Sequence, residues 1–485
     1  MSCVIAIDAG TTGVRSRAIF NDGRAAISSY QEFTQYFPRP GWVEHDAEEI
    51  WKVTLATLAT VFAQLDSSPT AIGITNQRET LVAWSKKSDI VLAPAIVWQD
   101  RRTAHRCVEL SPHLGLVRRT TGLVLDPYFS GTKAEWLLKH GNVVASPDLA
   151  LGTIDSWILW RLTGGATFAT DASNASRTML FDITKNTWSE ELCDLLGVPI
   201  SSLAEVLPSS GRFGLTNCQG IPNGIPISGI AGDQQASLFG QACFSAGSAK
   251  NTYGTGSFVL MNVGASCPAP TAGLLNTIAW NIDGVTTYAV EGAIFATGAA
   301  VQWLRDGLEI ISDSAEVELL ATSVDSSHGV VVVPAFAGLG SPWWDAEARG
   351  AVFGFTKGTT RAHLARATLE SIAFQTRDVM NAINEATGVS LTSLRVDGGA
   401  ASNNFLMQLQ ADHIGVTVLR AKDRDTTALG AAFLAGLAEG MWTSLSEIAD
   451  QWESDRAFVP ATDNDATNAS YEQWLRAVER TRTHN

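Results

Sequence analysis

The pattern of apolar and polar positions begins with a short apolar run that stops at a glycine-containing turn. Residues 3–7 are all apolar, and they are followed by Asp8 and a turn that contains Gly10. A short apolar run bounded by glycine is typical of a buried strand that ends in a tight loop. Residues 71–75 form a second run of this kind. Two buried strands are therefore predicted in the first part of the chain.

Between these two runs, the apolar residues return at helical spacing. Asp46, followed three residues later by Glu49, is a capping-box pattern that marks the start of a helix. Ile50, Val53 and Leu58 then fall on or near one face of this predicted helix. Strands that alternate with helices predict an α/β fold built in layers.

The second half of the chain repeats this alternation. Strands are predicted at 329–334 and 394–397, and helices at about 361–386 and about 403–414, the last ended by Gly415.

One strand in each half stops at an aspartate and a glycine loop, at Asp8 and at Asp397. Two such loops in matching contexts indicate a duplicated domain, and the length of the chain exceeds that of one ordinary core. We therefore expect an α/β fold of two duplicated domains, residues 1–243 and 244–485, that face each other across a central cleft.

Composition narrows the range of partners. The chain has 34 basic and 49 acidic residues, a net charge of −15, and no cluster of Lys or Arg beyond short pairs. Nucleic acids and anionic membrane surfaces need a basic footprint, so neither is expected as a main partner. The six cysteines include no CxxC pair, and no stretch approaches the ~20 apolar residues of a membrane span. The N-terminus enters a strand pattern without a signal peptide, so we expect a cytoplasmic protein without membrane insertion.

The loop after the first strand carries candidate phosphate chemistry. Phosphoryl transfer needs N–H groups and hydroxyls around the phosphates, a carboxylate for the metal and a base for the acceptor hydroxyl. The P-loop signature GxxxxGK[ST] is absent, so a nucleotide would be held in another way. Asp8 could hold Mg²⁺, and Thr11 and Thr12 could bind phosphate oxygens. Arg15 could neutralise phosphate charge, although an ordinary strand and turn is the alternative interpretation of this segment alone.

Two loops of the second half could complete a nucleotide site. Residues 250–256 offer hydroxyls and glycines, and residues 397–400 offer glycines that leave room for a base and a ribose. A cleft needs walls from both halves of the chain, and these loops would supply them.

Several segments of the chain resemble the FGGY family of carbohydrate kinases, within the sugar kinase, actin and Hsp70 superfamily. These segments are residues 40–46, 73–80, 126–133, 229–235, 251–256 and 395–400. Among them, Asn-Gln-Arg-Glu-Thr at 76–80 and Asp-Pro-Tyr-Phe-Ser-Gly-Thr-Lys at 126–133 are similar to the glycerol kinases of the family. The resemblance implies two RNase H-like domains of the actin and hexokinase type. It also implies an enzyme that uses ATP and Mg²⁺ to convert glycerol to sn-glycerol 3-phosphate.

The resemblance further implies roles for single residues. Asp233 would be the base that takes the proton from the reacting hydroxyl as its oxygen attacks the γ-phosphorus. The residues implied to bind glycerol are Arg78, Glu79, Trp98, Tyr128, Asp233, Gln234 and Phe258. Those implied to bind the nucleotide are Thr11, Thr12, Gly13, Arg15, Thr255, Gly298, Gln302, Gly399 and Asn403, with Asp8 acting on Mg²⁺. A homodimer or homotetramer is also expected.

Each residue of the implied glycerol site also has a structural interpretation. Trp98 and Phe258 could be core aromatics in a chain with 15 tryptophans. Arg78 and Glu79 could form a surface ion pair of little energetic value. Asp233 could cap the helix that follows it.

The sequence departs from the family pattern at a few positions. Gly13 stands where many glycerol kinases have Ser, and Ala9 where many have Gln, so one hydroxyl near the phosphates is lost. Gly224 holds the place of the Arg found in members inhibited by fructose 1,6-bisphosphate. The His of members activated by phosphorylation is missing, because no histidine lies between His140 and His328. We expect neither form of control.

Two other functions stay open on the sequence alone. One is another polyol or ketose kinase of the same family, although xylulose-type kinases do not resemble this chain at 76–79. The other is an actin- or Hsp70-like ATP-driven binding protein. That function would need a filament interface or a polypeptide-binding domain, and the chain has no spare segment for the latter.

Overall fold

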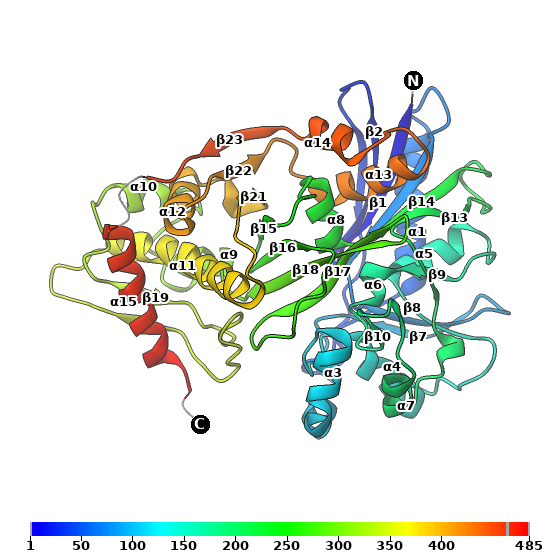
Figure 1. Ribbon diagram of the computed structural model, residues 1–485, viewed down its shortest axis with the longest axis horizontal. Coiled ribbons are helices and arrows are strands. Elements are labelled where there is room, and N and C mark those ends of the chain that lie inside the picture. Colours follow the sequence, from blue (N-terminus) through cyan, green and yellow to red (C-terminus); the bar gives the residue numbers. More distant parts are fainter. Residues whose placement is uncertain (1, 462–464, 484–485) are drawn as a thin grey trace.

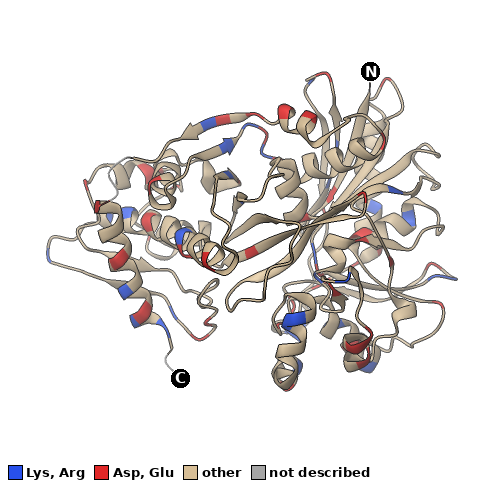
Figure 2. Cartoon of the chain, viewed as in Figure 1, with Lys and Arg blue, Asp and Glu red and all other residues tan. Residues whose placement is uncertain are grey.

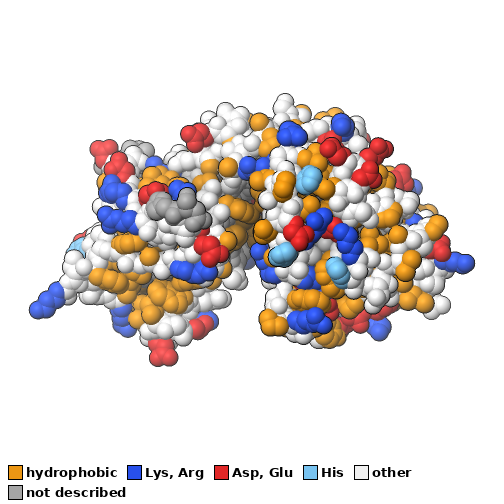
Figure 3. Space-filling model, turned by 90° about the horizontal axis from the view of Figure 1, so that it is seen from below, with side chains coloured by type: hydrophobic (Ala, Val, Ile, Leu, Met, Phe, Trp, Pro, Cys, Tyr) orange, Lys and Arg blue, Asp and Glu red, His pale blue; other side chains and the backbone are white. Residues whose placement is uncertain are grey.

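One sheet of 13 strands runs through both lobes of the protein, as the computed structural model shows (Figure 1). Residues 2–461 and 465–483 are described by this structure. Seen from below, a hollow separates the two lobes (Figure 3). The sheet and this hollow confirm the expected α/β fold of two domains around a central cleft. Lys, Arg, Asp and Glu are spread over both lobes (Figure 2).

The first half of the chain contributes three antiparallel strands followed by two parallel ones. The antiparallel strands are β3 (Ile27–Glu32), β2 (Gly13–Phe20) and β1 (Cys3–Ala9). The parallel strands are β5 (Ala71–Asn76), beside β1, and β14 (Pro226–Gly232), beside β5. The predicted strands at 3–7 and 71–75 are thus confirmed.

The second half contributes the same succession of strands. The antiparallel strands are β18 (Val285–Ile294), β16 (Ser257–Gly264) and β15 (Ser248–Tyr253). The parallel strands are β21 (Ser393–Asp397) and β22 (Val418–Ala421). The repeated order of antiparallel and parallel strands confirms the duplication that the two aspartate–glycine loops predicted. The large sheet ends at β3 on one side and at β23 (Ser454–Phe458) on the other. In its middle, β17 (Leu275–Ile282) and β13 (Ser210–Leu215) join the two sets of strands.

The predicted helices form at the expected places. Asp46 is the N-cap of α1 (Ala47–Phe62), where its side chain accepts hydrogen bonds from the backbone of Glu48 and Glu49. In the second half, α11 (Arg361–Thr387) and α12 (Asn404–Ile414) match the predicted helices. Gly415 ends α12 in the left-handed conformation at φ 70°, as its C-cap. The run at 329–334 forms the short strand β19 (Val331–Val333), which pairs with β20 (Ala351–Phe353) outside the large sheet.

The remaining elements pack around these two halves. In the first half the remaining strands are β4 (Glu44–His45), β6 (Leu81–Ser85), β7 (Val91–Ile96), β8 (Leu149–Thr153), β9 (Ala169–Asp171), β10 (Phe181–Asp182), β11 (Thr187–Trp188) and β12 (Glu205–Leu207). The remaining helices of that half are α2 (Ala104–Glu109), η1 (Ser111–His113), α3 (Leu114–Thr121), α4 (Ser130–His140), α5 (Ile154–Leu162), α6 (Ala172–Ala175), α7 (Glu190–Leu196) and η2 (Ile200–Ser202). In the second half they are α9 (Gly298–Gln302), the π-helical turn η3 (Trp303–Gly307), α10 (Glu316–Thr322), the short 3-10 helix η4 (Gly399–Ser402), α14 (Leu445–Gln451) and α15 (Asp465–Thr481). None of the helices among the described residues has the length and apolar character needed to cross a membrane.

Two helices cross where the halves meet. They are α8 (Asp233–Gly240) from the first half and α13 (Thr426–Ala438) from the second. A Cβ atom on Gly430 would lie 1.8 Å from the carbonyl oxygen of Ala236, and one on Gly240 would lie 2.0 Å from that of Thr426. The two helices therefore approach so closely that neither glycine position has room for a side chain.

Helix α13 also packs on β1, β5 and β14, so a helix of the second half covers the sheet of the first. The division of the chain at 243/244 stays a prediction.

Candidate functional site

Arg78 is the centre of a buried polar cluster that begins where β5 ends. Only 2% of its surface is exposed, and its Nη2 atom donates a hydrogen bond of 3.1 Å to the hydroxyl of Tyr128. Its Nε atom lies 3.3 Å from Oδ1 of Asp233. The adjacent Glu79 is also buried and has φ 61°, a backbone conformation that non-glycine residues rarely adopt. Arg78 and Glu79 are thus buried residues and not a surface ion pair.

Asp233 is the first residue of α8 and faces the cluster from the end of β14. The N-cap of α8 is Gly232, and no side chain forms a capping hydrogen bond there. The Oδ1 atom of Asp233 accepts a hydrogen bond of 2.7 Å from the backbone N–H of Gln234. Its side chain is 32% exposed, whereas that of Arg78 is 1% exposed. The carboxylate of Asp233 is therefore within reach of a small molecule in the cleft.

Two charged residues that the sequence analysis did not predict complete the cluster. Glu291 on β18 accepts a hydrogen bond of 2.7 Å from Nη1 of Arg78 and one of 3.0 Å from Nη2 of Arg177. Arg177 also donates a hydrogen bond of 2.7 Å from Nε to Oε1 of Glu79. Burial alone would raise the pKa of Glu291, but the guanidinium groups of Arg177 and Arg78 lower it to about 2. The cluster thus contains two buried cations, Arg78 and Arg177, each of which pairs with the two buried anions Glu79 and Glu291.

The sequence held one signal for Glu291. It is the only charged residue in the strand Val285–Ile294, where its neighbours are largely apolar. A charge inside a buried strand requires a partner, which points to an ion pair. No feature of the sequence indicated that the partners were Arg78 and Arg177.

Lys250 on β15 is a further buried charge beside the cluster. Its Nζ atom donates hydrogen bonds to Oε1 of Gln234 and, over 3.0 Å, to Oγ1 of Thr252. Burial lowers the pKa of Lys250 to about 8. The contact fixes the side chain of Gln234, one of the residues predicted to bind glycerol. Lys250 belongs to the segment 250–256 that the sequence analysis had singled out, but no role had been assigned to it.

The loop between β1 and β2 holds the residues predicted to bind phosphate and Mg²⁺. Asp8 lies near the end of β1, and burial, followed by the nearby carboxylate of Asp233, raises its pKa to about 7. The Oγ1 atom of Thr11 accepts a hydrogen bond of 3.0 Å from Nε1 of Trp98. The ring of Trp98 in turn meets that of Tyr128 edge to face, with 5.6 Å between centroids. Trp98 thus connects the phosphate loop to the Arg78 cluster.

Three buried or partly buried side chains hold the backbone of the loop between β1 and β2. Gln77 donates to the carbonyl oxygen of Gly10 over 3.1 Å, and Gln35 donates to that of Thr11 over 2.9 Å. His45 joins the two amides, because Nε2 lies 2.7 Å from Oε1 of Gln35 and Nδ1 lies 3.3 Å from Nε2 of Gln77. A neutral ring that donates through Nε2 and accepts at Nδ1 satisfies both contacts. Burial lowers the pKa of His45 to about 4, so the ring is neutral at physiological pH.

Two arginines of β2 connect the first half of the chain to a segment of the second half. Arg15, predicted to bind phosphate, forms an ion pair with Asp425, and Arg17 forms one with Asp423. Both aspartates lie between β22 and α13, in the second half of the chain. The phosphate loop of the first half is thereby tied to the start of α13.

The nucleotide residues predicted in the second half surround the adjacent ends of β15 and β21. The N–H of Gly298 donates to the carbonyl oxygen of Gly254 over 3.0 Å, which places α9 against the loop of Thr255. A Cβ atom on Gly298 would lie 2.6 Å from that same oxygen, whereas one on Gly399 would meet no atom within 4 Å. Gln302 ends α9, so it stays close to this loop.

The other two predicted site residues of the second half are Asn403 and Phe258. Asn403 is the N-cap of α12, and its side chain accepts a hydrogen bond of 2.8 Å from the N–H of Leu406. Phe258 lies on β16, opposite Thr252 on one side and Ala293 on the other. Within the described ranges, no side-chain hydrogen bond, ion pair or ring contact joins Phe258 to the Arg78 cluster.

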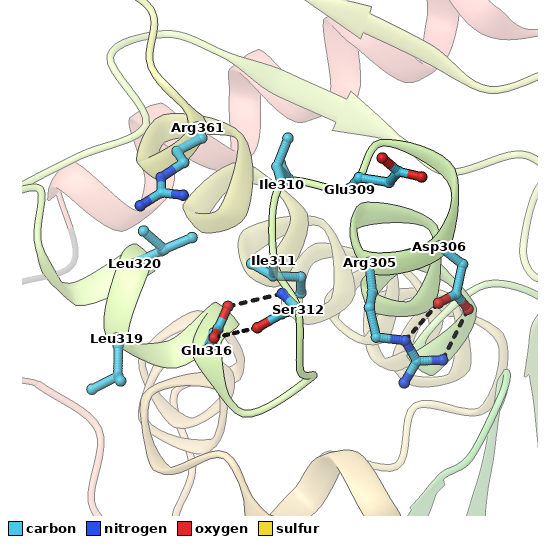
Figure 4. A pocket seen from close by; sticks show the side chains of 10 residues that line it. All are labelled: Arg305, Asp306, Glu309, Ile310, Ile311, Ser312, Glu316, Leu319, Leu320 and Arg361. Atoms are coloured by element: carbon cyan, nitrogen blue, oxygen red, sulfur yellow. Dashed lines mark hydrogen bonds and ion pairs between the residues drawn. The ribbon is translucent and has the colours of Figure 1, made fainter.

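A separate hollow of about 980 Å³ lies between η3 and α10 (Figure 4). None of the predicted site residues lines it, and the first lining residue, Arg305, lies a short distance after Gln302 in the chain. Two interactions link polar groups inside the hollow, since Arg305 pairs with Asp306 and Glu316 accepts hydrogen bonds from Ser312 (Figure 4).

Comparison with known proteins gives full-length matches. The N-terminal domain of the FGGY family of carbohydrate kinases matches residues 3–240, and the C-terminal domain matches residues 249–439. Glycerol kinases of Geobacillus kaustophilus and Thermus thermophilus are each 52% identical over 98% of both chains. A crystal structure of Plasmodium falciparum glycerol kinase with ADP superposes with a TM-score of 0.95. It is 34% identical and covers 100% of this chain and 99% of its own.

A more distant structure shows the fold alone. Xylulose kinase of Lactobacillus acidophilus superposes with a TM-score of 0.90 over 99% of this chain and 98% of its own, at 22% identity.

Proposed function

Because this chain belongs to the FGGY family of carbohydrate kinases, we propose that it transfers the γ-phosphoryl group of ATP to glycerol. The products are sn-glycerol 3-phosphate and ADP. The observation that carries this proposal is the buried cluster around Arg78, which joins Tyr128 and Asp233 at one point of the cleft. The similarity to glycerol kinases over nearly the whole chain supports the same substrate.

The proposed glycerol site combines fixed polar groups with aromatic walls. Glycerol has three hydroxyls, each of which can donate and accept a hydrogen bond, so it needs both kinds of partner. Arg78 offers donors held in place by Glu291 and Tyr128. Glu79, Asp233 and Gln234 offer acceptors. The proposed walls along the carbon chain are Trp98, Tyr128 and Phe258.

Asp233 is the proposed base. Its carboxylate takes the proton of the glycerol hydroxyl while that oxygen forms a bond to the γ-phosphorus and the bond to the β-phosphate oxygen breaks. The hydrogen bond from Gln234 and the nearby Arg78 hold the carboxylate in one orientation. Closure of the two lobes would exclude water, which otherwise could accept the phosphoryl group instead of glycerol.

The proposed nucleotide site uses both lobes. Thr11, Thr12, Gly13 and Arg15 would hold the phosphates from the first half. The residues proposed for the adenosine side are Thr255, Gly298, Gln302, Gly399 and Asn403. The open space at Gly399 supports this assignment, because a Cβ atom there would meet no protein atom within 4 Å.

Asp8 fits a role toward Mg²⁺. The side chain of Asp8 is partly buried, and this burial, followed by the negative charge of nearby Asp233, raises its pKa. A bound cation would offset that negative charge, which supports the proposal. Within the described ranges, no group of three or more His, Cys, Asp or Glu could hold a metal ion by itself. Such a site suits an ion that shares its ligands with nucleotide phosphates and water. When bound, Mg²⁺ neutralises charge on the transferred phosphoryl group.

An ADP-release assay over several acceptors tests the proposal. The purified protein is supplied with ATP, Mg²⁺ and, in turn, glycerol, dihydroxyacetone, xylulose, ribulose or erythritol. Glycerol is expected to give the highest kcat/KM, and mass spectrometry is expected to identify glycerol 3-phosphate. A clear preference for a ketose would overturn glycerol as the substrate while leaving the family assignment intact. The homodimer or homotetramer and the cytoplasmic location stay predictions.

A further inference from the structure

Tyr30 on β3 lies directly over Gly13 of the phosphate loop. Strands β2 and β3 are antiparallel, with Arg15 opposite Tyr30. Alternate residues of a strand share a face, so Gly13 lies on the same side as Arg15 and Tyr30. A Cβ atom on Gly13 would come within 2.7 Å of the Tyr30 hydroxyl oxygen and 2.8 Å of its Cε2 atom. The outer end of the Tyr30 ring thus fills the space that a side chain at position 13 would need.

The hydroxyl of Tyr30 lies beside the loop proposed to bind phosphate. It lies 3.4 Å from Oγ1 of Thr12, and the guanidinium carbon of Arg15 lies 5.6 Å from the centre of the ring. Tyr30 is 48% exposed, so the residue lies at the surface and not in the core. Three residues of the proposed phosphate site, Thr12, Gly13 and Arg15, therefore share one neighbour that has no assigned role.

We infer that the Tyr30 hydroxyl donates a hydrogen bond to an outer phosphate of ATP and so takes the place of the serine that many glycerol kinases have at position 13. This inference rests on the proposed function. A glycine at position 13 removes one hydroxyl from the loop, and the Tyr30 ring returns a hydroxyl to the same place from the neighbouring strand. A hydrogen bond from a neutral hydroxyl to a charged phosphate oxygen is stronger than one between neutral groups.

The same geometry explains why glycine is required at position 13. Its Cβ atom would also approach the backbone carbonyl oxygen of Gln31 to 2.6 Å. A serine would therefore have to displace both the Tyr30 ring and the β3 backbone. Gly13 and Tyr30 thus form one unit, in which the small residue makes room for the large one.

Replacing Tyr30 by phenylalanine tests the inference. Tyr30→Phe keeps the ring over Gly13 and Arg15 but removes the hydroxyl. Calorimetric titration with Mg²⁺-ATP in the absence of glycerol is expected to show roughly tenfold weaker binding. The KM for glycerol and the midpoint of thermal unfolding are expected to stay as in the wild type. ATP binding as tight as that of the wild type would overturn the inference, as would an equal rise in the KM for glycerol.

Tyr36→Phe is the matched control. Tyr36 is 43% exposed, and in the part of the chain that the structure describes it bonds only through its backbone, to Glu44. Its replacement is expected to leave ATP binding unchanged. A tenfold loss in this variant too would overturn the assignment to Tyr30.

A second pair of variants tests whether the ring occupies the place of the serine. Gly13→Ser is expected to lower the unfolding midpoint, and the loss is expected to shrink when Tyr30→Ala is added. An equal loss in both backgrounds would overturn this part of the inference. If the wild type produces no glycerol 3-phosphate, the proposed function fails, whereas the titration with Mg²⁺-ATP still decides the role of Tyr30.

Discussion

The Nε atom of Arg78 and the Oδ1 atom of Asp233 lie 3.3 Å apart, although they come from the ends of two different strands of the sheet. Strands β5 and β14 are parallel neighbours, so the residues that follow them meet at one edge. This edge faces the cleft between the lobes. Parallel strands in an α/β sheet commonly place functional residues in this way.

The first prediction concerns Asp233. Asp233→Asn keeps an oxygen that can accept from the N–H of Gln234 but cannot take a proton from glycerol. We expect kcat to fall by a factor on the order of 10² to 10⁴, with a much smaller change in the KM for glycerol. Steady-state ADP release measures both constants. Asp283→Asn, in the exposed turn between β17 and β18, is the control and should keep full activity. Full turnover in Asp233→Asn would exclude Asp233 as the base.

The second prediction concerns the buried ion pairs. Glu291→Gln removes one of two anions that neutralise Arg78 and Arg177, which leaves buried positive charge without compensation. We expect a loss of about 3 kcal/mol in the free energy of unfolding, measured with urea. We also expect a higher KM for glycerol, because Arg78 loses the contact that holds its donors.

An exposed ion pair provides the control for this experiment. Lys422 and Glu453 pair with side chains that are 68% and 63% exposed. Glu453→Gln is expected to leave stability unchanged, because solvent screens such a pair. If both variants were equally stable, the cluster around Arg78 would not need the charge of Glu291.

The third prediction concerns the pH dependence that His45 confers. The folded state holds His45 neutral with a pKa of about 4, whereas the unfolded chain binds a proton near pH 6.5. Stability is therefore lost as the pH falls from about 6.5 to about 4, and this loss amounts to about 3 kcal/mol. In His45→Gln that part of the loss should be absent, as urea unfolding at a series of pH values will show. The exposed His113→Gln should retain it.

The fourth prediction concerns the crossing of α8 and α13. Gly430→Ala places a methyl group 1.8 Å from the carbonyl oxygen of Ala236, so the helices must separate. Overpacking of this kind costs roughly 1–3 kcal/mol, and we expect a lower midpoint of thermal unfolding. Gly115→Ala on α3 is the matched control, because its new methyl group meets only the end of the flexible Arg119 side chain, at 3.2 Å. That variant should be slightly more stable, as alanine favours helix. A lower midpoint in both variants would contradict the prediction that the close approach of α8 and α13 causes the loss of stability.

Much of the fold could be predicted because its signals are local. The apolar runs before Asp8 and before Asp397 correspond to β1 and β21, and Gly415 ends α12 as predicted. Helix α15 was not predicted, since its sequence is mostly polar. Its apolar side is narrow, yet Tyr471 and Trp474 on that side are buried against the second lobe.

The candidate site could be predicted only in part, for a different reason. Arg78, Glu79 and Asp233 lie in segments with a recognisable pattern, and the structure brings them together. Glu291 and Arg177 become visible only when distant parts of the chain meet, because their partners are set by the sheet and not by spacing. The contact between Tyr30 and Gly13 depends in the same way on the pairing of β2 with β3.

The position of α13 also determines the order in which the chain can fold during synthesis. Its buried side packs on residues of the first half such as Val4, Ala6 and Ala231. Ribosomes add roughly 5–20 residues per second, so on the order of ten to forty seconds pass between completion of α8 and completion of α13. During that time α8 is present on this apolar face of the first sheet, but the part that α13 will bury stays uncovered. The nascent first half therefore cannot complete its core until nearly the whole chain has been made, and in this interval it is exposed to aggregation and open to binding by chaperones.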